Sequence, residues 1–284
     1  MGAAPDEEEW LETNRARWDE LVPLHLASDF YDQSALRAGH GRLYRIEEGE
    51  LPEIAPDGWD GLRVLHLQCH FGADSLVLAQ RGATVVGIDF SKPAVLAARE
   101  LAQEVGLADR SRFIHANVYD ARHRLPDPEG FDVVYTTWGT IGWLPDVAEW
   151  ARIIAWFLKP GGRLYFADGH PTAFVFDGAD EAGRPVWAYP YEPSGEPDVI
   201  DEPGDYADAG VQLTNAKTFE WGHPLGEVLT ALIDAGLTID FVHEHYEVPW
   251  QIFDATVPKG EGMWGWPAEN WLPLSVSIAA TNSR

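Results

Sequence analysis

The feature that most constrains the fold is the regular alternation of short apolar runs with helical segments between residues 64 and 168. The apolar runs have the length of buried strands. Strands that alternate with helices pair in parallel through right-handed crossovers, so the sequence predicts an α/β fold with a doubly wound sheet. The predicted strands are 64–67, 84–89, 112–116, 131–136 and 163–168, and the predicted helices are 74–81, 94–105 and 147–158.

The N-terminal segment has a different pattern. Residues 7–27 carry apolar side chains at helical spacing, whereas 28–56 has the loose pattern of a mobile connection. We predict that residues 1–56 form a helical cap or lid and that the compact domain covers 57–284.

The alternation also breaks after the fifth predicted strand. Residues 170–222 are rich in Pro, Gly, Asp and Tyr, which predicts a long insertion on the substrate side of the sheet. A helix at 225–234 and strands at 238–247 and 274–280 follow. Four tryptophans in the loop before the last strand either pack that loop or line an aromatic pocket.

The charge balance disfavours a nucleic-acid partner. The chain has 20 basic and 46 acidic residues and a net charge of −26, which repels a phosphate backbone. No apolar run reaches the roughly 18 residues that span a bilayer, and the acidic N-terminus lacks the features of a secretory signal. We expect a cytoplasmic protein that binds neither nucleic acid nor membrane. The lone Cys69 excludes an internal disulfide and a paired-cysteine metal site, so no metal is expected; the oligomeric state is not defined.

Ligands of open α/β sheets bind beyond the carboxyl ends of the strands. The first such loop contains Gln68, His70, Gly72 and Asp74. Gly72 lets a ligand approach the backbone and the positive end of the next helix, which Asp74 opens and can cap. Taken alone, this loop is also compatible with an ordinary strand-to-helix turn.

The next two loops carry groups that suit a nucleoside. Asp89, beside Phe90, ends the second strand, where a carboxylate accepts hydrogen bonds from ribose hydroxyls; a helix cap is its alternative role. Asn117 and Val118 follow the third strand, where a side-chain amide and a backbone N–H can read an adenine edge. Asn117 is also a common turn residue.

The loop after the fourth strand is polar and aromatic. It begins with Thr137 and Trp138 in the run TTWGTIGW. This loop can hold the tail of a cofactor, while Trp138 or Trp143 forms the floor of a substrate pocket.

Five segments together resemble the successive motifs of class I S-adenosylmethionine-dependent methyltransferases: VLHLQCHFGADS, VVGIDFS, FIHANVYD, FDVVYTTWGT and LKPGG. The resemblance covers about 64–168. It implies a Rossmann-like, mostly parallel seven-stranded sheet with an antiparallel last strand, S-adenosylmethionine as cofactor, S-adenosylhomocysteine as product and a small-molecule methyl acceptor. The residues expected to bind the cofactor are Trp18, Gln68, His70, Gly72, Asp74, Asp89, Phe90, Asn117, Val118, Thr137 and Trp138.

The first motif departs from the family pattern of an acidic residue followed by three alternating glycines. Here His66 replaces the acid, and Gln68 and His70 replace the first two glycines. Side chains at these two positions are acceptable if the local φ is negative, and His70 then donates to the methionine carboxylate. Because His66 removes a usual anchor, the sequence does not define how the methionine ammonium is held.

Methyl transfer from a sulfonium depends mainly on alignment and exclusion of water, so a dedicated base is not required. Tyr31 and His170 are the candidates for orienting or deprotonating the acceptor. Their alternative roles are a packing aromatic and a turn residue before Pro171. Trp18, on the apolar face of the first helix, either closes over the cofactor or packs on the core.

Other functions share these features. A non-catalytic protein that binds S-adenosylmethionine or its product would keep the same loops. A nicotinamide-dependent oxidoreductase uses a similar sheet, although Gln68 and His70 disfavour the close approach of a pyrophosphate. A protein or nucleic-acid methyltransferase is a further alternative, and O-, N- and C-methylation are not distinguished.

Overall fold

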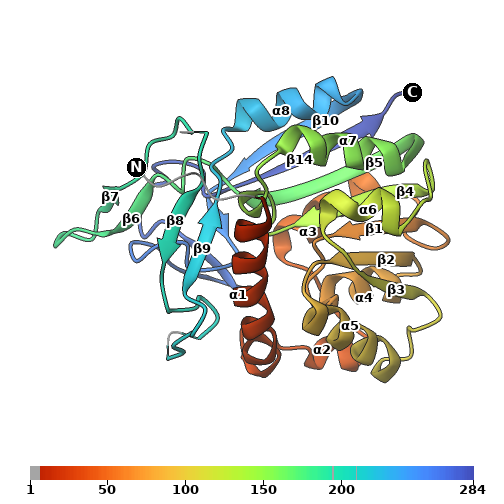
Figure 1. Cartoon of the computed structure of the whole chain (residues 1–284), viewed down its shortest axis with the longest axis horizontal. Helices are drawn as coiled ribbons and strands as arrows, with labels where there is room; N and C mark the ends of the chain where they lie inside the picture. The colour runs from red at the N-terminus through yellow and green to blue at the C-terminus, as the bar shows by residue number, and fades with distance from the viewer. Residues whose placement is uncertain (1–6, 194, 209) are drawn as a thin grey trace.

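A computed structural model describes residues 7–193, 195–208 and 210–284, and its centre is a seven-stranded sheet (Figure 1). The order is β10-β14-β5-β4-β1-β2-β3; β1 to β5 are parallel, and β14 is antiparallel to β5 and β10. The predicted Rossmann-like sheet with an antiparallel last strand is therefore confirmed. The strands are β1 (Arg63–Leu67), β2 (Thr84–Asp89), β3 (Ser111–His115), β4 (Phe131–Thr137), β5 (Leu158–Gly169), β10 (Leu237–His245) and β14 (Ser275–Asn282).

Helices cover both faces of this sheet, because alternate residues of the central strands are apolar on both sides. In β1, Leu65 and Leu67 pack with α6, α7 and α8, whereas Val64 packs with α3, α4 and α5. None of the helices in the described part of the chain is long and apolar enough to cross a membrane. The helices are α1 (Glu7–Ala27), α2 (Ser34–Arg37), α3 (Arg45–Ile54), α4 (Ala73–Gln80), α5 (Lys92–Glu104), η1 (Val118–Asp120), α6 (Ala121–Arg124), η2 (Ile141–Trp143), α7 (Val147–Phe157) and α8 (Leu225–Asp234).

The loose pattern of residues 28–56 concealed two helices, α2 and α3. Within α3, Ile46, Leu51 and Ile54 are buried, as expected for an amphipathic helix, but so are Glu47 and Glu50. These two buried carboxylates interrupt the apolar periodicity, and the expectation of an irregular connection was wrong for that reason. The first six residues of the predicted cap lie outside the described residues.

The predicted turn at LKPGG belongs to β5, since Leu158 already pairs with Phe131 of β4. The predicted insertion contains two small antiparallel sheets, β6-β7 and β8-β9. A third small sheet, β11-β13-β12, replaces the loop that was expected before the last strand. The strands are β6 (Phe176–Ala179), β7 (Pro185–Trp187), β8 (Asp198–Asp201), β9 (Lys217–Glu220), β11 (Glu247–Val248), β12 (Val257–Gly260) and β13 (Met263–Gly265).

These additions join the main sheet through their own packing. Phe176, Phe253 and Trp266 form a separate apolar core with Leu274, next to the start of β14. Helix α1 contacts both α5 and β9, so it connects the main sheet to the insertion (Figure 1). The additions and α1 together enclose the space above the carboxyl ends of the strands.

Candidate active site

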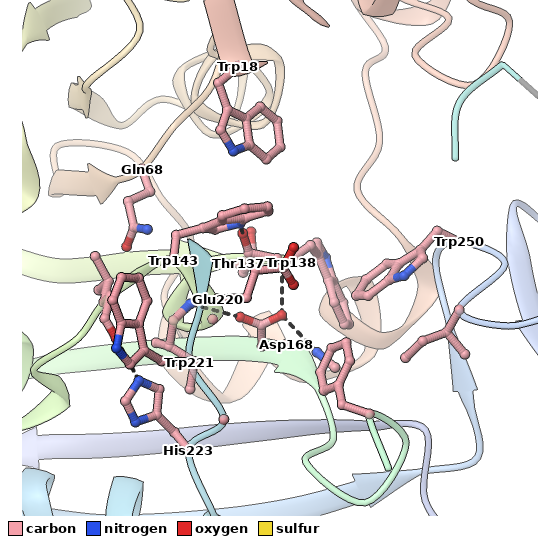
Figure 2. A pocket seen from close by; sticks show the side chains of 18 of the residues that line it. Trp18, Gln68, Thr137, Trp138, Trp143, Asp168, Glu220, Trp221, His223 and Trp250 are labelled. Carbon is pink, nitrogen blue, oxygen red and sulfur yellow. Dashed lines mark hydrogen bonds between the residues drawn. The ribbon is translucent and has the colours of Figure 1, made fainter. Parts of the chain in front are cut away.

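A cavity of about 520 Å³ lies at the carboxyl ends of the parallel strands. Its sheet-side wall consists of the lining residues that follow β1 to β5, and its insertion-side wall consists of the lining residues between Pro171 and Pro224. In the view of Figure 2, Trp18 and Gln68 lie at one end and Trp221 and His223 at the other. All the residues predicted to bind the cofactor line this cavity except Gly72.

The loop after β1 has the left-handed backbone typical of a glycine-rich turn, although two of its three left-handed residues are not glycine. Gln68 has φ +56° and His70 has φ +50°, so the expectation of a negative φ was wrong. Left-handed backbone is strained for residues with a Cβ and is found mostly at functional sites. The Gln68 amide donates to the carbonyl of Thr140 at 2.8 Å, which ties this loop to the loop after β4. Cys69, between them, is buried, and burial raises the pKa of its thiol well above its ordinary value.

Gly72 has a structural role in this loop. It adopts φ +74° before the first residue of α4, and a Cβ there would lie 2.6 Å from the ring of Phe113. The position therefore requires glycine because of the close packing of α4 on β3, and Gly72 does not face the ligand.

The carboxylate of Asp74 lines the cavity. Asp74 is the second residue of α4 and makes no side-chain cap, contrary to its predicted capping role. Burial raises the pKa of Asp74 to about 6. The carboxyl of Glu47, from α3, is nearby, and burial together with the charge of Asp74 raises the pKa of Glu47 to about 8. Glu47 accepts hydrogen bonds from the Tyr135 hydroxyl and the indole of Trp138.

His66 occupies the position of the family's acidic residue and is uncharged. Its Nδ1 lies 2.8 Å from the Ser75 hydroxyl, and burial lowers its pKa to about 3. The ring packs edge-on against Tyr135 at a centroid distance of 4.8 Å. The carboxylates beside this loop are therefore those of Asp74, which lines the cavity, and Asp89, which accepts the backbone N–H of His70.

Asp89 is held rigidly at the end of β2. One carboxylate oxygen accepts the backbone N–H of His70 at 2.7 Å and the other accepts that of Ser91 at 2.8 Å. Burial raises the pKa of Asp89 to about 6, which leaves it mostly ionised at neutral pH. Phe90 also lines the cavity. These bonds fix the direction of the remaining lone pairs, as a hydroxyl-binding carboxylate requires.

Asn117 and Val118 line the cavity after β3. The Asn117 side-chain oxygen accepts the N–H of Tyr119 at 3.1 Å and caps η1. The turn role of Asn117 is thus observed, and its amide nitrogen is the side-chain group not used in that bond. Recognition of adenine by these residues stays a prediction.

Asp168 organises the loop after β4, a role that the sequence did not reveal. Its buried carboxylate accepts backbone N–H groups of Gly139, Thr140 and Gly169 at 2.6, 2.8 and 2.8 Å and the Thr140 hydroxyl at 3.0 Å (Figure 2). This loop starts with Thr137 and with Trp138, which has φ +57°. An acidic residue at the end of a buried strand is the signal that could have identified Asp168.

A buried chain of side chains joins three segments that are remote in sequence. Asp205 of the insertion lies 3.2 Å from Nε2 of His25 in α1, and Nδ1 of His25 lies 2.9 Å from Nε2 of His70. The side chains of His25 and Asp205 are 0% and 2% exposed. An ionised carboxylate only accepts, so His25 donates from Nε2 to Asp205, and its Nδ1 pairs with Nε2 of His70. Burial and His25 lower the pKa of His70 well below its ordinary value.

Sequence reasoning missed His25 and Asp205. Trp18 and His25 are seven residues apart, two turns along one face of α1, and this spacing was a usable signal for His25. Asp205 lies in a segment without periodicity and gave no comparable signal.

The two candidate catalytic residues differ in position. Tyr31 lines the cavity, its hydroxyl is hydrogen-bonded to that of Tyr206, and burial raises its pKa well above the ordinary value. His170 is buried outside the cavity lining, with Nδ1 2.7 Å from the Thr172 hydroxyl and Nε2 3.2 Å from Glu244. The structure thus places His170 in a turn, in agreement with its alternative role.

Comparison with known proteins agrees with this geometry. A family model described as a methyltransferase domain matches residues 65–166. The ubiquinone biosynthesis O-methyltransferase of Stutzerimonas stutzeri is 36% identical over 118 residues, which cover 41% of this chain and 49% of that protein. Residues 65–166 thus match a methyltransferase domain, in agreement with the resemblance to the class I S-adenosylmethionine-dependent methyltransferases.

Two further comparisons show how much of the chain is similar to other methyltransferases. The 23S rRNA (uracil(1939)-C(5))-methyltransferase RlmD of Azoarcus is 46% identical over 120 residues, 36% of this chain and 27% of that protein. The solved structure of an S-adenosylmethionine dependent methyltransferase from Mesorhizobium loti has a TM-score of 0.55 and 23% identity over 82% of this chain and 97% of that one, which shows the fold. The chain spans about half the length, or less, of these curated relatives.

The residues of the sheet-side wall fit the cofactor of this methyltransferase family, S-adenosylmethionine. Among the described residues, the buried Gln68 Oε1 and Trp18 Nε1 atoms have no hydrogen-bond partner, although both residues line the cavity. Buried polar atoms are normally paired, so these two are suited to a bound polar molecule. Asp89 and Asp74 add carboxylates for hydroxyl and ammonium groups.

Proposed function

We propose that this methyltransferase transfers a methyl group from S-adenosylmethionine to a small-molecule acceptor. The observation that carries the proposal is the single cavity that the cofactor loops share with α1 and the insertion. Bound S-adenosylmethionine supplies a methyl group on a sulfonium that is already activated for displacement. The residues of the chain have to bind, align and exclude water.

Five residues of the sheet-side wall have a proposed role in binding the cofactor. Asp89 binds the ribose hydroxyls, because backbone N–H groups fix its carboxylate in the cavity. Asp74 binds the methionine ammonium in place of an acid at position 66, where His66 is neutral. Asn117 and Val118 contact the adenine. His70, oriented by His25, contacts the methionine end.

On the acceptor side, Tyr31 orients the acceptor as a hydrogen-bond donor. Its raised pKa keeps the phenol protonated, so it is unsuited to remove a proton. We do not assign a chemical role to His170, which lies outside the lining.

A small acceptor suits the enclosure and the charge of the site. Among the described lining residues there is no Lys or Arg to contact a phosphate backbone. We therefore propose a cytoplasmic enzyme that binds neither nucleic acid nor membrane. The small-molecule reaction in the printed name of the Stutzerimonas relative supports this acceptor class.

Binding of S-adenosylhomocysteine tests the proposal. We expect micromolar-range affinity by calorimetry and a raised melting temperature, and no shift with NADH. Asp89→Ala should weaken binding by about 1 to 3 kcal/mol, because charged hydrogen bonds to ribose are lost. Asp57→Ala, an exposed carboxylate outside the cavity, is the matched control.

Three results would contradict the proposal in different ways. A shift with NADH alone would favour an oxidoreductase. Unchanged affinity in a folded Asp89→Ala variant would reject the ribose assignment. Tight S-adenosylhomocysteine binding without turnover of any member of a broad acceptor panel would favour the non-catalytic alternative.

A further inference from the structure

The insertion-side wall is acidic. Asp177, Asp198, Glu202 and Glu220 line it, and none of the described residues lining the cavity is Lys or Arg. The four carboxylates come from three different segments: β6, β8 with the residue that follows it, and β9. Their convergence on one wall is therefore a property of the folded insertion.

The four carboxylates all act on the hydroxyl of Tyr189, whose pKa is raised. Burial raises the pKa of Tyr189, and the charges of Asp177, Asp198, Glu220 and Glu202 raise it further. A hydroxyl surrounded by four carboxylates resists ionisation, because a further negative charge is unfavourable there. A positively charged group at the same place is stabilised for the same reason.

Arg17 carries a positive charge that acts on Glu220 of this wall, but Arg17 does not line the cavity. Its guanidinium donates to the backbone carbonyls of Glu202, Ala216 and Gly204 at 2.7, 3.1 and 2.8 Å. The charge of Arg17 lowers the pKa of Glu220, but burial has the larger effect, and the pKa of Glu220 is raised overall. The cavity therefore keeps its negative potential.

Glu220 has a special position among the four. The next residue, Trp221, donates its N–H to the carbonyl of Gly142 at 2.8 Å, so β9 ends against the loop of the sheet-side wall. Glu220 is partly buried, whereas Asp177, Asp198 and Glu202 are exposed. One Glu220 oxygen accepts the Thr218 hydroxyl at 2.8 Å. Glu220 thus directly precedes the residue that joins this wall to the loop after β4.

Aromatic residues line the same cavity as the four carboxylates. The insertion-side wall contains Phe174, Tyr189, Tyr191 and Trp221, and Trp250 lines the cavity as well. Aromatic faces attract cations and also bury apolar groups. The combination of rings and carboxylates matches an ammonium group on an apolar or aromatic body.

We propose that the acceptor is a primary or secondary amine with an apolar or aromatic body, that it enters as an ammonium, and that Glu220 accepts its proton. This inference rests on the proposed function. The ammonium loses one proton to the Glu220 carboxylate, and the freed lone pair forms the new nitrogen–carbon bond. The carbon–sulfur bond breaks with its electron pair remaining on sulfur, the product amine becomes positively charged, and Glu220 releases its proton to water.

The test is a screen of aromatic fragments in matched amine, alcohol and carboxylate forms, against the protein saturated with S-adenosylhomocysteine. Ligand-observed NMR measures binding, and mass spectrometry measures methylated product after exchange for S-adenosylmethionine. We expect hits concentrated among the amines, with an affinity that falls several-fold between about 0.05 and 0.3 M salt as the charges are screened.

Glu220→Gln keeps the shape and the oxygen that accepts from Thr218. It should weaken binding of the amine hits by about tenfold, the value expected for loss of one charged hydrogen bond. Glu269→Gln, an exposed carboxylate outside the cavity, removes the same charge and should leave amine affinity unchanged.

Failure of the inference differs from failure of the proposed function. If S-adenosylhomocysteine does not bind, the proposed function itself fails. If it binds but the amines give no more hits than the alcohols and acids, the proposed acceptor class is overturned. The same holds if no fragment binds at all. Amine binding without methylation on nitrogen overturns the assignment of Glu220 as proton acceptor.

Discussion

The two walls of the cavity both carry carboxylates, but they hold them differently. On the sheet-side wall, Asp89 and Asp168 are buried and bonded to backbone N–H groups. On the insertion-side wall, Asp177 and Asp198 are exposed. A carboxylate fixed by the backbone defines geometry, whereas an exposed one contributes mainly to the electrostatic potential. The sheet side is thus suited to one invariant cofactor and the insertion side to selection of an acceptor by charge.

The largest expected effect on this comparison comes from Asp168→Ala. The substitution leaves several buried N–H groups of the loop after β4 without an acceptor, each costing about 1 to 3 kcal/mol. We expect the free energy of unfolding, measured with urea, to fall by about 3 kcal/mol or more. Asp198→Ala on the opposite wall should change it by less than about 0.5 kcal/mol. Similar losses for both variants would remove the distinction between the walls.

The next effect is the pH dependence of stability due to Glu47. Its pKa is 4.5 ordinarily and about 8 in the fold, so between these values the folded protein holds a proton that the unfolded chain releases. Stability should therefore fall as pH rises through this window, and Asp74 and Asp89 act in the same direction up to about pH 6. One pKa unit corresponds to about 1.4 kcal/mol, or roughly 2–4 °C for a chain of this size.

Glu47→Gln should flatten the melting temperature between pH 6 and 8. Glu50, one turn further along α3, is the control. Burial alone would raise its pKa, but hydrogen bonds from His245, His243 and two hydroxyls lower it to about 2. Its contribution is therefore lost only as pH falls from 4.5 towards 2, and Glu50→Gln should leave the slope above pH 6 unchanged. An unaltered slope in Glu47→Gln would reject the assignment.

The smallest expected effect is on cofactor affinity and comes from Asp205. This residue belongs to the insertion, but its side chain is buried like those of Asp89 and Asp168. Asp205→Asn weakens the orientation of His25 and hence of His70. We expect about threefold to tenfold weaker binding of S-adenosylhomocysteine, because the contact that His70 makes with the methionine end is weakened by about the value of one hydrogen bond. Binding of 5′-methylthioadenosine, which lacks the amino-acid end, should not change.

The control for this variant is Asp208→Asn, an exposed neighbour. Equal loss of affinity for both ligands in Asp205→Asn would mean that the chain of side chains acts on the whole fold and not on the methionine end.

The sequence was sufficient for the sheet because strands buried on both faces are continuous apolar runs. It also located Asp89 and Asn117, since residues that follow such strands meet at one edge. It was insufficient for α3, where Glu47 and Glu50 occupy buried positions that periodicity assigns to apolar residues. Their burial depends on Tyr135, Trp138 and other partners from distant strands.

The backbone of the first loop was equally beyond prediction. Side chains at Gln68 and His70 argue for negative φ, yet both are left-handed, because contacts with Thr140 and His25 outweigh the local preference. The pairing of His25 with Asp205 joins residues 180 positions apart, which no local pattern encodes. Such long-range contacts determined the part of the site that the sequence left undefined.

Cys69 gives this chain an intrinsic reporter. It is the single cysteine, it is 4% exposed, and it lies in the strained loop between β1 and α4. A thiol reagent can react with it only when that loop opens, so the rate of modification measures the opening directly. The kinetics of the cofactor loop can therefore be followed in the unmodified protein, residue-specifically and without an engineered label.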